Sequence, residues 1–371
     1  SGKTVIAILA LLAAAENGYQ GALMVPTEVL ARQHFESITK MFENCGIDKK
    51  VVLITGSMTA REKRIAYEKT ASHEADIIIG THALIQEKVI YDKLALVITD
   101  EQHRFGVNQR AALTEKGENV HLLVMSATPI PRTLALLIYG DLDVSIIDEL
   151  PPGRQKIKTY AVGEQTRPRI DRFIDNQCAA GGQAYVVCPL VEDSEATDTQ
   201  RHSAEQTAQR LKTVLPHRRI GLVHGRTKTA EKEQIMRDFA DGNLDILVST
   251  TVIEVGVNVP NATLMVVENA DCFGMSQLHQ LRGRVGRGSR QSFCVFYGAD
   301  KGADARERLR TLVHTGDGFA IAQKDLEMRG AGDFFGTRQH GLPPLKLADL
   351  AGDARLLEQA QQAADALMAR D

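Results

Sequence analysis

The chain alternates short apolar runs with longer amphipathic stretches, and this alternation restricts its fold more than any other feature. Runs of three to five apolar residues suit strands buried on both faces, and the stretches between them have helical spacing. Strands that alternate with helices predict βαβ units and a parallel sheet covered on both faces. The apolar runs are Ala22–Val25, Val51–Ile54, Ile77–Ile79, Leu94–Ile98, Leu122–Met125, Ala184–Cys188, Ile220–Val223, Ile246–Val248, Leu264–Val267 and Phe293–Tyr297, and the helical stretches include Val29–Phe42 and Arg61–Ala71.

The length of the chain, 371 residues, predicts more than one domain, because a single core seldom grows that large. The alternation pauses at residues 149–154, where Pro151-Pro152-Gly153 has the composition of a linker, and then restarts. The two halves therefore share an architecture, without a repeat of residues. Glu192–Ser203 is polar and acidic, and we expect a surface loop there.

The composition limits the class of protein. Hydrophobic residues make up 43% and charged residues 25%, as in soluble globular proteins. The formal net charge is −3, so nucleic acid would have to bind at local basic surfaces. The five cysteines are widely spaced and never form CxxC, which predicts reduced thiols in the cytoplasm and neither a disulfide framework nor a zinc site. The longest apolar run, Val5–Ala15, is too short to span a bilayer, and since it has no charged leader sequence before it we do not expect secretion.

Gly2-Lys3-Thr4 precedes that apolar run and matches the last part of the phosphate-binding loop G-x-x-x-x-G-K-[ST]. In such a loop, backbone N–H groups surround the phosphates, the lysine reaches the β/γ oxygens and the hydroxyl ligates Mg²⁺. The tripeptide alone is weak evidence. Because the chain starts at Ser1 without Met or the earlier loop residues, we expect a fragment with weak ATPase activity.

Asp100 and Glu101 stand at the end of the apolar run Leu94–Ile98. Ligands of open α/β sheets bind at this end of the strands. A carboxylate can hold Mg²⁺ there, and a second can activate the water that attacks ATP. The two carboxylates could equally be solvent-exposed residues at the end of a strand. The other motifs decide between these two interpretations.

Hydroxyl residues and glycines follow the earlier strands, in the turns Thr27-Glu28, Thr55-Gly56 and Gly80-Thr81. Such residues are ordinary helix N-caps. The same geometry also presents backbone donors to phosphate, which holds nucleic acid without reading its sequence. Both interpretations stay open from these residues alone. After the next strand, Ser126 and Thr128 offer hydroxyls that could lie between the two carboxylates and a nucleic-acid site.

Residues 280–288, QLRGRVGRG, pack three arginines among three glycines. Glycines allow tight turns, and guanidinium groups suit fork-like contact with phosphate oxygens. The spacing is specific, and an exposed basic loop without function is the less favoured interpretation.

These motifs, in this order, resemble superfamily 2 helicases, and most closely the bacterial RecG family of branched-DNA helicases. The resemblance covers the chain from Gly2 to about Leu357. The matching segments are Pro26–Glu28, Gly80–His82, the DEQH box Asp100–His103 with Arg104-Phe105-Gly106, Ser126–Thr128, His224-Gly225, Ser249–Gly256 and the Arg284/Arg287 box.

The resemblance implies two RecA-like domains that close on ATP and Mg²⁺. In that family Lys3 and Thr4 would hold phosphate and Mg²⁺, Asp100 would hold Mg²⁺ through water, and Glu101 would activate the attacking water. Arg284 and Arg287 would reach the γ-phosphate from the second domain. The implied nucleotide-binding residues also include Gly2, Gln280 and Gly256, and the implied nucleic-acid-binding or coupling residues are Thr27, Thr55, Gly80, Thr81, His82, His103, Ser126, Thr128, His224, Thr250, Thr251, Arg329, Arg338 and Gln339.

Asp325–Gly341 resembles the translocation motif that RecG shares with the transcription–repair coupling factor. In that motif a helical hairpin and a loop transmit domain movement to duplex DNA, and Arg329 and Gln339 match its key positions. A helix pair that merely packs on the second domain is the alternative. Gln102-His103 of the DEQH box and Ser126 favour RecG over the coupling factor. The departures from the family pattern are Asn258, Ala331 and Cys272, where Asp, Pro and Arg are usual.

We therefore expect the motor part of an ATP-dependent double-stranded DNA translocase that remodels stalled forks and Holliday junctions in recombination and repair. The expected domains are a truncated first RecA-like domain (1–149), a second (150–300) and a helical hairpin with a C-terminal helix (301–371). The resemblance also implies a monomer in a bacterial cytoplasm, with branched DNA and a single-stranded-DNA-binding protein as partners. The wedge domain that recognises junctions is not expected in this stretch. The alternatives are a transcription–repair coupling translocase and a non-catalytic nucleic-acid-binding module.

Overall fold

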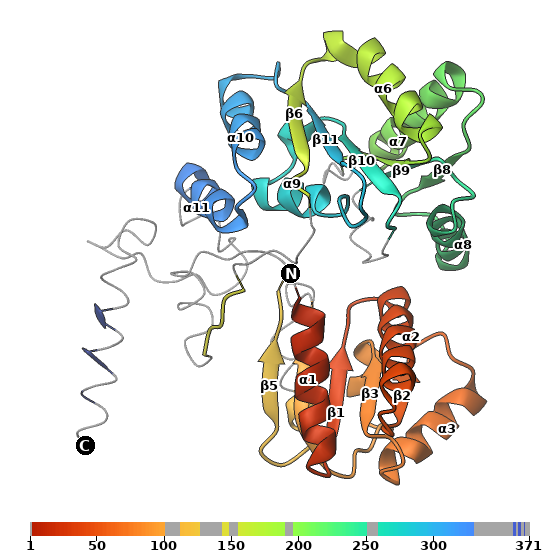
Figure 1. Ribbon diagram of the computed structural model, residues 1–371, viewed down its shortest axis with the longest axis vertical. Coiled ribbons are helices and arrows are strands. Elements are labelled where there is room, and N and C mark those ends of the chain that lie inside the picture. Colours follow the sequence, from red (N-terminus) through yellow and green to blue (C-terminus); the bar gives the residue numbers. More distant parts are fainter. Residues whose placement is uncertain are drawn as a thin grey trace. The chain divides into compact units, whose positions relative to one another are not determined.

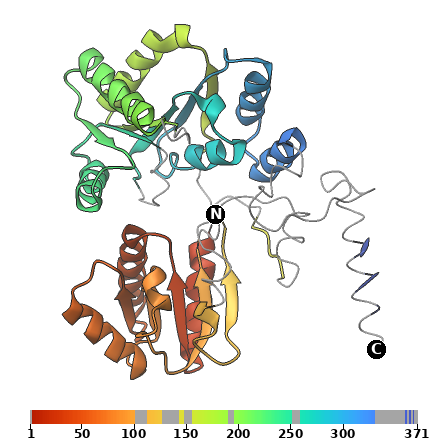
Figure 2. The ribbon, with the colours of Figure 1, turned by 180° about the vertical axis from the view of Figure 1, so that it is seen from behind.

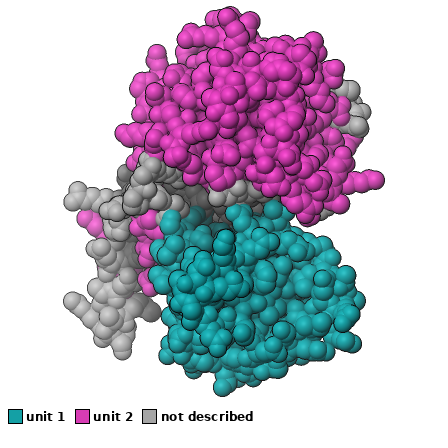
Figure 3. All heavy atoms as spheres, turned by 45° about the vertical axis from the view of Figure 1, so that its right-hand side comes forward, with its two compact units in different colours: residues 1–127, 149–151, 254–257 teal, residues 128–148, 152–253, 258–371 magenta. Residues whose placement is uncertain are grey.

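The structure is a computed structural model, and it describes residues 2–100, 112–126, 143–147, 155–189, 196–250 and 259–329, with 359–360, 363–364 and 367. The chain divides into two compact units, which Figure 3 colours separately. Unit 1 comprises residues 1–127, 149–151 and 254–257, and unit 2 comprises the remainder. The three-domain division at 149/150 and 300/301 stays a prediction.

In its described residues, unit 1 is built on a parallel sheet with the strand order β2-β3-β1-β4-β5 (Figure 1). The apolar run that follows Gly2-Lys3-Thr4 forms a helix, which leads into β1. The elements are α1 (Lys3–Glu16), β1 (Gln20–Met24), α2 (Glu28–Cys45), β2 (Val51–Ile54), α3 (Ala60–Ala71), β3 (Ile77–Gly80), the short 3₁₀ helix η1 (His82–Ile85), β4 (Leu94–Thr99) and β5 (His121–Val124).

Both faces of this sheet are buried, because successive side chains of a strand point to opposite faces. On one face Leu23 of β1 packs with α1 and α2. On the other face, seen from behind in Figure 2, Ala22 and Met24 pack with α3 and η1. The nearly continuous apolar runs of the sequence follow from this double burial.

The described part of unit 2 forms a second parallel sheet with the order β6-β11-β10-β7-β9-β8. Two parallel α/β sheets confirm the predicted fold class. The elements are β6 (Lys158–Val162), η3 (Glu164–Thr166), α6 (Arg167–Ala179), β7 (Gln183–Cys188), α7 (Ala196–Val214), β8 (Ile220–Val223), α8 (Thr229–Ala240), β9 (Ile246–Thr250), β10 (Ala262–Val267), η5 (Ala270–Cys272), α9 (Met275–Arg282), β11 (Phe293–Tyr297), α10 (Ala303–His314) and α11 (Gly318–Arg329).

The surface loop predicted over Glu192–Ser203 is wrong from Ala196 onward, where α7 already begins. Ala204, Ala208 and Leu211 of α7 are buried at helical spacing against the sheet. Once such a packed stripe fixes a helix, each residue added to its end costs little, so even a polar sequence continues it. At 196–203 a polar composition therefore does not distinguish a surface loop from the polar end of a helix.

The two sheets repeat one topology. Read from β8, unit 2 runs β8-β9-β7-β10-β11 and then adds β6 at the edge, whereas unit 1 runs β2-β3-β1-β4-β5. The strands β8, β9, β7, β10 and β11 of unit 2 thus correspond to β2, β3, β1, β4 and β5 of unit 1, with β7 and β1 in the middle of these five.

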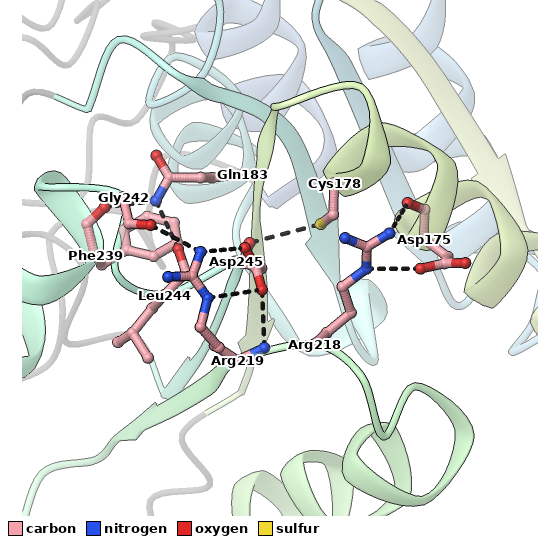
Figure 4. A network of polar contacts seen from close by, with 9 residues as sticks. All are labelled: Asp175, Cys178, Gln183, Arg218, Arg219, Phe239, Gly242, Leu244 and Asp245. Carbon is pink, nitrogen blue, oxygen red and sulfur yellow. Dashed lines mark hydrogen bonds and ion pairs between the residues drawn. The ribbon is translucent and has the colours of Figure 1, made fainter.

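The repeat extends to individual hydrogen bonds at the amino ends of the strands. Gln183 Nε2 donates to Phe239 O at 2.5 Å and to Leu244 O at 2.7 Å (Figure 4), and Asp245 Oδ2 accepts from Arg219 N at 2.9 Å. This network joins the end of α8 to the starts of β7, β8 and β9.

Unit 1 makes the same bonds at the matching positions. Gln20 Nε2 donates to Thr70 O at 2.9 Å and to Ala75 O at 2.8 Å, and Asp76 Oδ2 accepts from Lys50 N at 2.7 Å. The two units therefore share these hydrogen-bonded positions as well as their architecture, although most of the residue types at those positions differ.

Candidate nucleotide and nucleic-acid site

The described site residues predicted in unit 1 gather at the carboxyl edge of its sheet. Asp100 directly follows β4, and its N–H donates to Met24 O of β1 at 3.0 Å. Ser126 lies two residues beyond the neighbouring strand β5, in which Val124 is paired with Thr99. Thr55 and Thr81 follow β2 and β3, which are paired through Ile54 and Gly80.

The start of α1 lies at the same edge, where the arrows of the strands end in Figure 1. Gly2 is its N-cap, with a left-handed φ of 72°, and Lys3 begins the helix. Lys3 Nζ is buried, and the hydroxyl of Thr4 is in the first turn. A helix N-terminus attracts anions through its free N–H groups and dipole. An ammonium, a hydroxyl and the carboxylate of Asp100 are a donor set that fits a nucleotide phosphate with Mg²⁺.

The carboxylate of Asp100 also faces α2. Its Oδ2 lies 3.8 Å from Nε2 of His34, and the two side chains are only 14% and 12% exposed. His34 was not among the predicted site residues. Its place on the buried stripe of α2, between Leu30 and Ile38, is the signal that could have identified it.

Glu28 joins two of the predicted motifs. Its carboxylate accepts a hydrogen bond from Ser57 N at 2.9 Å and another from the Ser57 hydroxyl. Thr27 caps α2, accepting from Leu30 N at 3.4 Å. The turn after β2 is therefore tied to the first turn of α2, and the N–H of Ser57 is already used within the protein.

Gly80 has no room for a side chain at the end of β3. A Cβ there would lie well inside contact distance of the Ile54 carbonyl oxygen and 2.9 Å from Leu84 Cγ. The glycine lets β2 and β3 stay paired up to this edge and leads into Thr81.

The hydroxyls of Thr55 and Thr81 are buried and, among the described residues, have no hydrogen-bond partner. Buried hydroxyls are normally bonded, so these two mark an edge where further polar atoms can be accepted. His82, the next residue, is exposed at the start of η1. The helix-cap interpretation is confirmed for Thr27, whereas Thr81 makes no such cap bond. The phosphate interpretation stays a prediction.

In unit 2, His224 and Thr250 occupy the corresponding edge. His224 follows β8, with Nε2 3.9 Å from Glu205 Oε1 of α7. Thr250 ends β9, and its hydroxyl is buried without a hydrogen-bond partner in the described part of the chain.

The arginine segment that follows α9 divides into two kinds of side chain. Arg284 and Arg287 lie near Tyr185 of β7: burial raises the pKa of this tyrosine, and the two positive charges oppose the shift. Arg287 is exposed, and Arg284 is half-buried. Gly286 between them has a left-handed φ of 76°, the conformation that glycine favours.

Arg282, the remaining arginine of the segment and not one of the predicted site residues, does not face solvent. Its guanidinium donates to Leu312 O at 2.6 Å and Thr315 O at 3.0 Å, and its other nitrogen lies 2.8 Å from His279 Nδ1. The side chain is 5% exposed, and burial lowers its pKa. Arg282 therefore fixes the end of α9 to the end of α10. Gln280 lies half-buried in the same helix.

Unit 2 has its own counterpart of Asp100, but that carboxylate is already neutralised. Glu268 follows β10 as Asp100 follows β4, with its N–H bonded to Val187 O at 2.8 Å. Both of its oxygens accept from Arg167, each at 2.9 Å, and its hydrogen bonds raise the pKa of Arg167. Arg167 also lies 4.4 Å from the ring centroid of Tyr297. A carboxylate paired in this way is not available to Mg²⁺.

Several predicted residues lie outside the part of the chain that the structure describes. For Arg329 the helix α11 is described but not the side chain. The others are Glu101, Gln102, His103, Thr128, Thr251, Gly256, Asn258, Ala331, Arg338 and Gln339.

Comparison with known families identifies the chain. Family models match over residues 1–137 for DEAD/DEAH box helicases and over 167–289 for the helicase conserved C-terminal domain. A third model, the C-terminal part of domain 3 of the ATP-dependent DNA helicase RecG, matches residues 315–371. The ATP-dependent DNA helicase RecG of Bacillus subtilis is 51% identical over 372 residues, covering 100% of this chain and 54% of that protein. The chain belongs to the RecG family.

Other RecG proteins agree with this assignment. That of Thermotoga maritima is 49% identical over 362 residues, covering 98% of this chain and 46% of the relative. A RecG solved with a three-way DNA junction superposes with a TM-score of 0.78 at 46% identity, over 96% of this chain and 46% of that one. The chain thus spans about half the length of the RecG relatives it matches. The likeness to yeast Dbp5, with a TM-score of 0.60 at 17% identity, concerns the fold alone.

Two further observations concern the cysteines and the helices. All five cysteines are free thiols, with Cys178, Cys188 and Cys294 buried. Within the ranges described above, no helix combines the length and apolar character that crossing a bilayer needs.

Proposed function

We propose that this chain is the motor part of an ATP-dependent double-stranded DNA translocase that remodels branched DNA such as stalled forks and Holliday junctions. The observation that carries the proposal is 51% identity to a RecG helicase along the whole chain. Support at residue level comes from the carboxyl edge of unit 1, where the start of α1 and the end of β4 bring an ammonium, a hydroxyl and a carboxylate to the same edge of the sheet.

The nucleotide is assigned to unit 1. Lys3 would hold phosphate oxygens, Thr4 and Asp100 would hold Mg²⁺, and Glu101 would take the proton of the attacking water. Mg²⁺ supplies charge neutralisation to the transferred phosphoryl group. In unit 2 the equivalent carboxylate, Glu268, is paired with Arg167 on both oxygens, which supports a single nucleotide site in the described units.

Arg284 and Arg287 are assigned to hydrolysis. Gly286 turns the backbone between them and Arg287 is exposed, whereas Arg282 is buried and donates to Leu312 O. Arginines that stabilise charge in phosphoryl transfer contribute on the order of 10³–10⁵ in rate. Gln280 and Gly256 are assigned to the same site from the family motifs.

DNA is assigned to the turns at the carboxyl edges of the sheets. Thr27, Thr55, Gly80, Thr81 and His82 in unit 1 offer hydroxyls, backbone donors and an exposed imidazole, none of which distinguishes one base from another. A translocase needs such sequence-independent contacts. His224, Thr250 and Thr251 are assigned to DNA in unit 2, and His103, Ser126 and Thr128 are assigned to the link between DNA and ATP.

The segment from Asp325 onward is assigned to force transmission. It begins in α11, which packs against α9, the helix that leads into Arg284 and Arg287. Arg329, Arg338 and Gln339 would carry movement from that helix to duplex DNA. Substituting Arg329 with alanine would then reduce fork unwinding more than ATP hydrolysis.

The test is ATP turnover with forked DNA by this chain and by the variants Asp100→Asn and Arg287→Ala. We expect at least about a 100-fold loss of DNA-stimulated turnover in each, because a charge needed in the transition state is removed. Arg290→Ala is the matched control, since Arg290 is exposed and donates only to Ala180 O in the described contacts. The weak turnover expected from the sequence is measured in the same assay. Unchanged turnover in Asp100→Asn contradicts the proposal, and fork binding without any turnover favours the non-catalytic module.

A further inference from the structure

His34 is a polar residue at an apolar position. Leu30, Ala31, Ile38 and Phe42 form the buried stripe of α2 against the sheet, and His34 continues their helical spacing. A leucine would satisfy the packing at this position. The sequence places an imidazole there instead, and polar groups that break the local pattern are expected at functional sites.

Nε2 of His34 is buried and has no hydrogen-bond partner in the described chain. Its polar neighbour is the carboxylate of Asp100, with Oδ2 at 3.8 Å. Both side chains are almost enclosed, at 12% and 14% exposure, so water screens their attraction only weakly. In the tautomer that protonates Nε2, an N–H this close to a carboxylate favours one orientation of that carboxylate.

The helix that carries His34 is held at its first turn and along its length. Thr27 caps it, and Glu28 binds both the N–H and the hydroxyl of Ser57 in the turn after β2. The buried stripe fixes its rotation on the sheet. The imidazole is therefore presented to Asp100 by a rigid element and not by a loop.

We propose that His34 is a positioning residue, which orients the Asp100 carboxylate for Mg²⁺ and thereby sets the affinity of the nucleotide site for the metal. Groups that orient a metal-binding carboxylate commonly affect metal affinity by 10–100-fold. The inference rests on the proposed function, because Asp100 holds Mg²⁺ only if unit 1 binds the nucleotide.

The test compares His34→Leu, which fills the apolar position, with His34→Gln, whose amide nitrogen replaces the Nε2 donor. Glu36→Ala, at an exposed position of the same helix, is the control. For each protein we measure the melting temperature and the Mg²⁺ concentration that gives half-maximal binding of a fluorescent, non-hydrolysable ATP analogue. Neither measurement requires turnover.

We expect His34→Leu to melt at or above the temperature of the parent and to need about 10-fold more Mg²⁺ or higher. His34→Gln should recover most of that loss, and Glu36→Ala should match the parent. His34→Met is a second apolar variant, should His34→Leu not fold. Failure of both apolar variants to fold would show a purely structural role and overturn the proposal.

Asp100→Asn separates this inference from the proposed function. A raised Mg²⁺ requirement in Asp100→Asn with an unchanged one in His34→Leu overturns the role of His34 alone. An unchanged requirement in Asp100→Asn, or no binding of the analogue by the parent, overturns the nucleotide assignment and the role of His34 together. Equal losses in His34→Leu and His34→Gln also count against a donor role, since the glutamine keeps the N–H.

Discussion

At the scale of single residues, Gly80 shows how the absence of a side chain shapes the candidate DNA edge. The space where its Cβ would be is taken by the carbonyl oxygen of Ile54 and the side chain of Leu84. The backbone oxygen cannot move without breaking the pairing of β2 with β3. The turn that carries Thr81 and His82 therefore depends on this glycine.

Gly80→Ala should destabilise unit 1 by about 1–3 kcal/mol, the usual cost of forcing extra atoms into a packed site. Denaturant unfolding followed by circular dichroism measures the change. Gly225→Ala is the control, because nothing lies within 4 Å of a Cβ at Gly225. Equal stability of the Gly80 and Gly225 variants would mean that β3 tolerates a shift at this edge.

The three arginines of residues 282–287 show what sequence could and could not predict about the site. The spacing predicted that the segment binds phosphate, and this role is proposed above for Arg284 and Arg287. Arg282 has the same chemistry, but its partners are carbonyls about thirty residues later in the sequence, at Leu312 and Thr315. Only the tertiary structure decides which guanidinium is buried, and the same holds for His34 beside Asp100.

At the scale of elements, Arg282 links α9 to the end of α10, just before α11 begins. A buried cation that donates to two carbonyls leaves those carbonyls unsatisfied when it is removed. The link joins α9 to the helix that directly precedes residues 315–371, the range that matches the RecG model.

Arg282→Met should lower the free energy of unfolding of unit 2 by about 2–3 kcal/mol, because it removes the hydrogen bonds of a charged donor. It should also speed hydrogen exchange in α10 and α11 more than in β7 and β9. Arg310→Met, on an exposed part of α10, is the control for the loss of charge. Uniform acceleration across unit 2 would show that Arg282 supports the whole core and not this link.

Two elements show where local sequence patterns fail. β6 was not predicted, because it is an edge strand whose side chains are only partly buried, and its apolar part is limited to Tyr160–Val162. The start of α7 was predicted as a loop from its acidic, polar residues. The strands buried in the middle of both sheets were predicted within one or two residues, since double burial demands continuous apolar runs.

At the scale of the whole molecule, each unit has its own hydrophobic core and its own sheet. The cysteines are distributed unequally between them. Cys178, Cys188 and Cys294 are buried in unit 2, whereas Cys45 is exposed in unit 1. Burial raises the pKa of Cys178 to about 11, so this thiol stays protonated at neutral pH.

A thiol reagent at pH 8 should modify Cys45 and Cys272 rapidly and the three buried cysteines at least on the order of 10³-fold more slowly, because they react only when unit 2 opens. Mass spectrometry after labelling in increasing denaturant measures this. The three buried thiols should become reactive together, at the denaturant concentration where unit 2 unfolds. Reaction of Cys294 well before Cys188 would show that the core of unit 2 opens in parts.

The duplicated network at the amino ends of the strands gives the molecule an internal comparison. Gln20 and Gln183 donate to equivalent carbonyls in unit 1 and unit 2, so one substitution can be made twice in the same polypeptide with the same chemistry. Any difference between the two effects then belongs to the surroundings of each unit and not to the bond. A pair of such variants would therefore measure how differently two copies of one fold depend on the same contact.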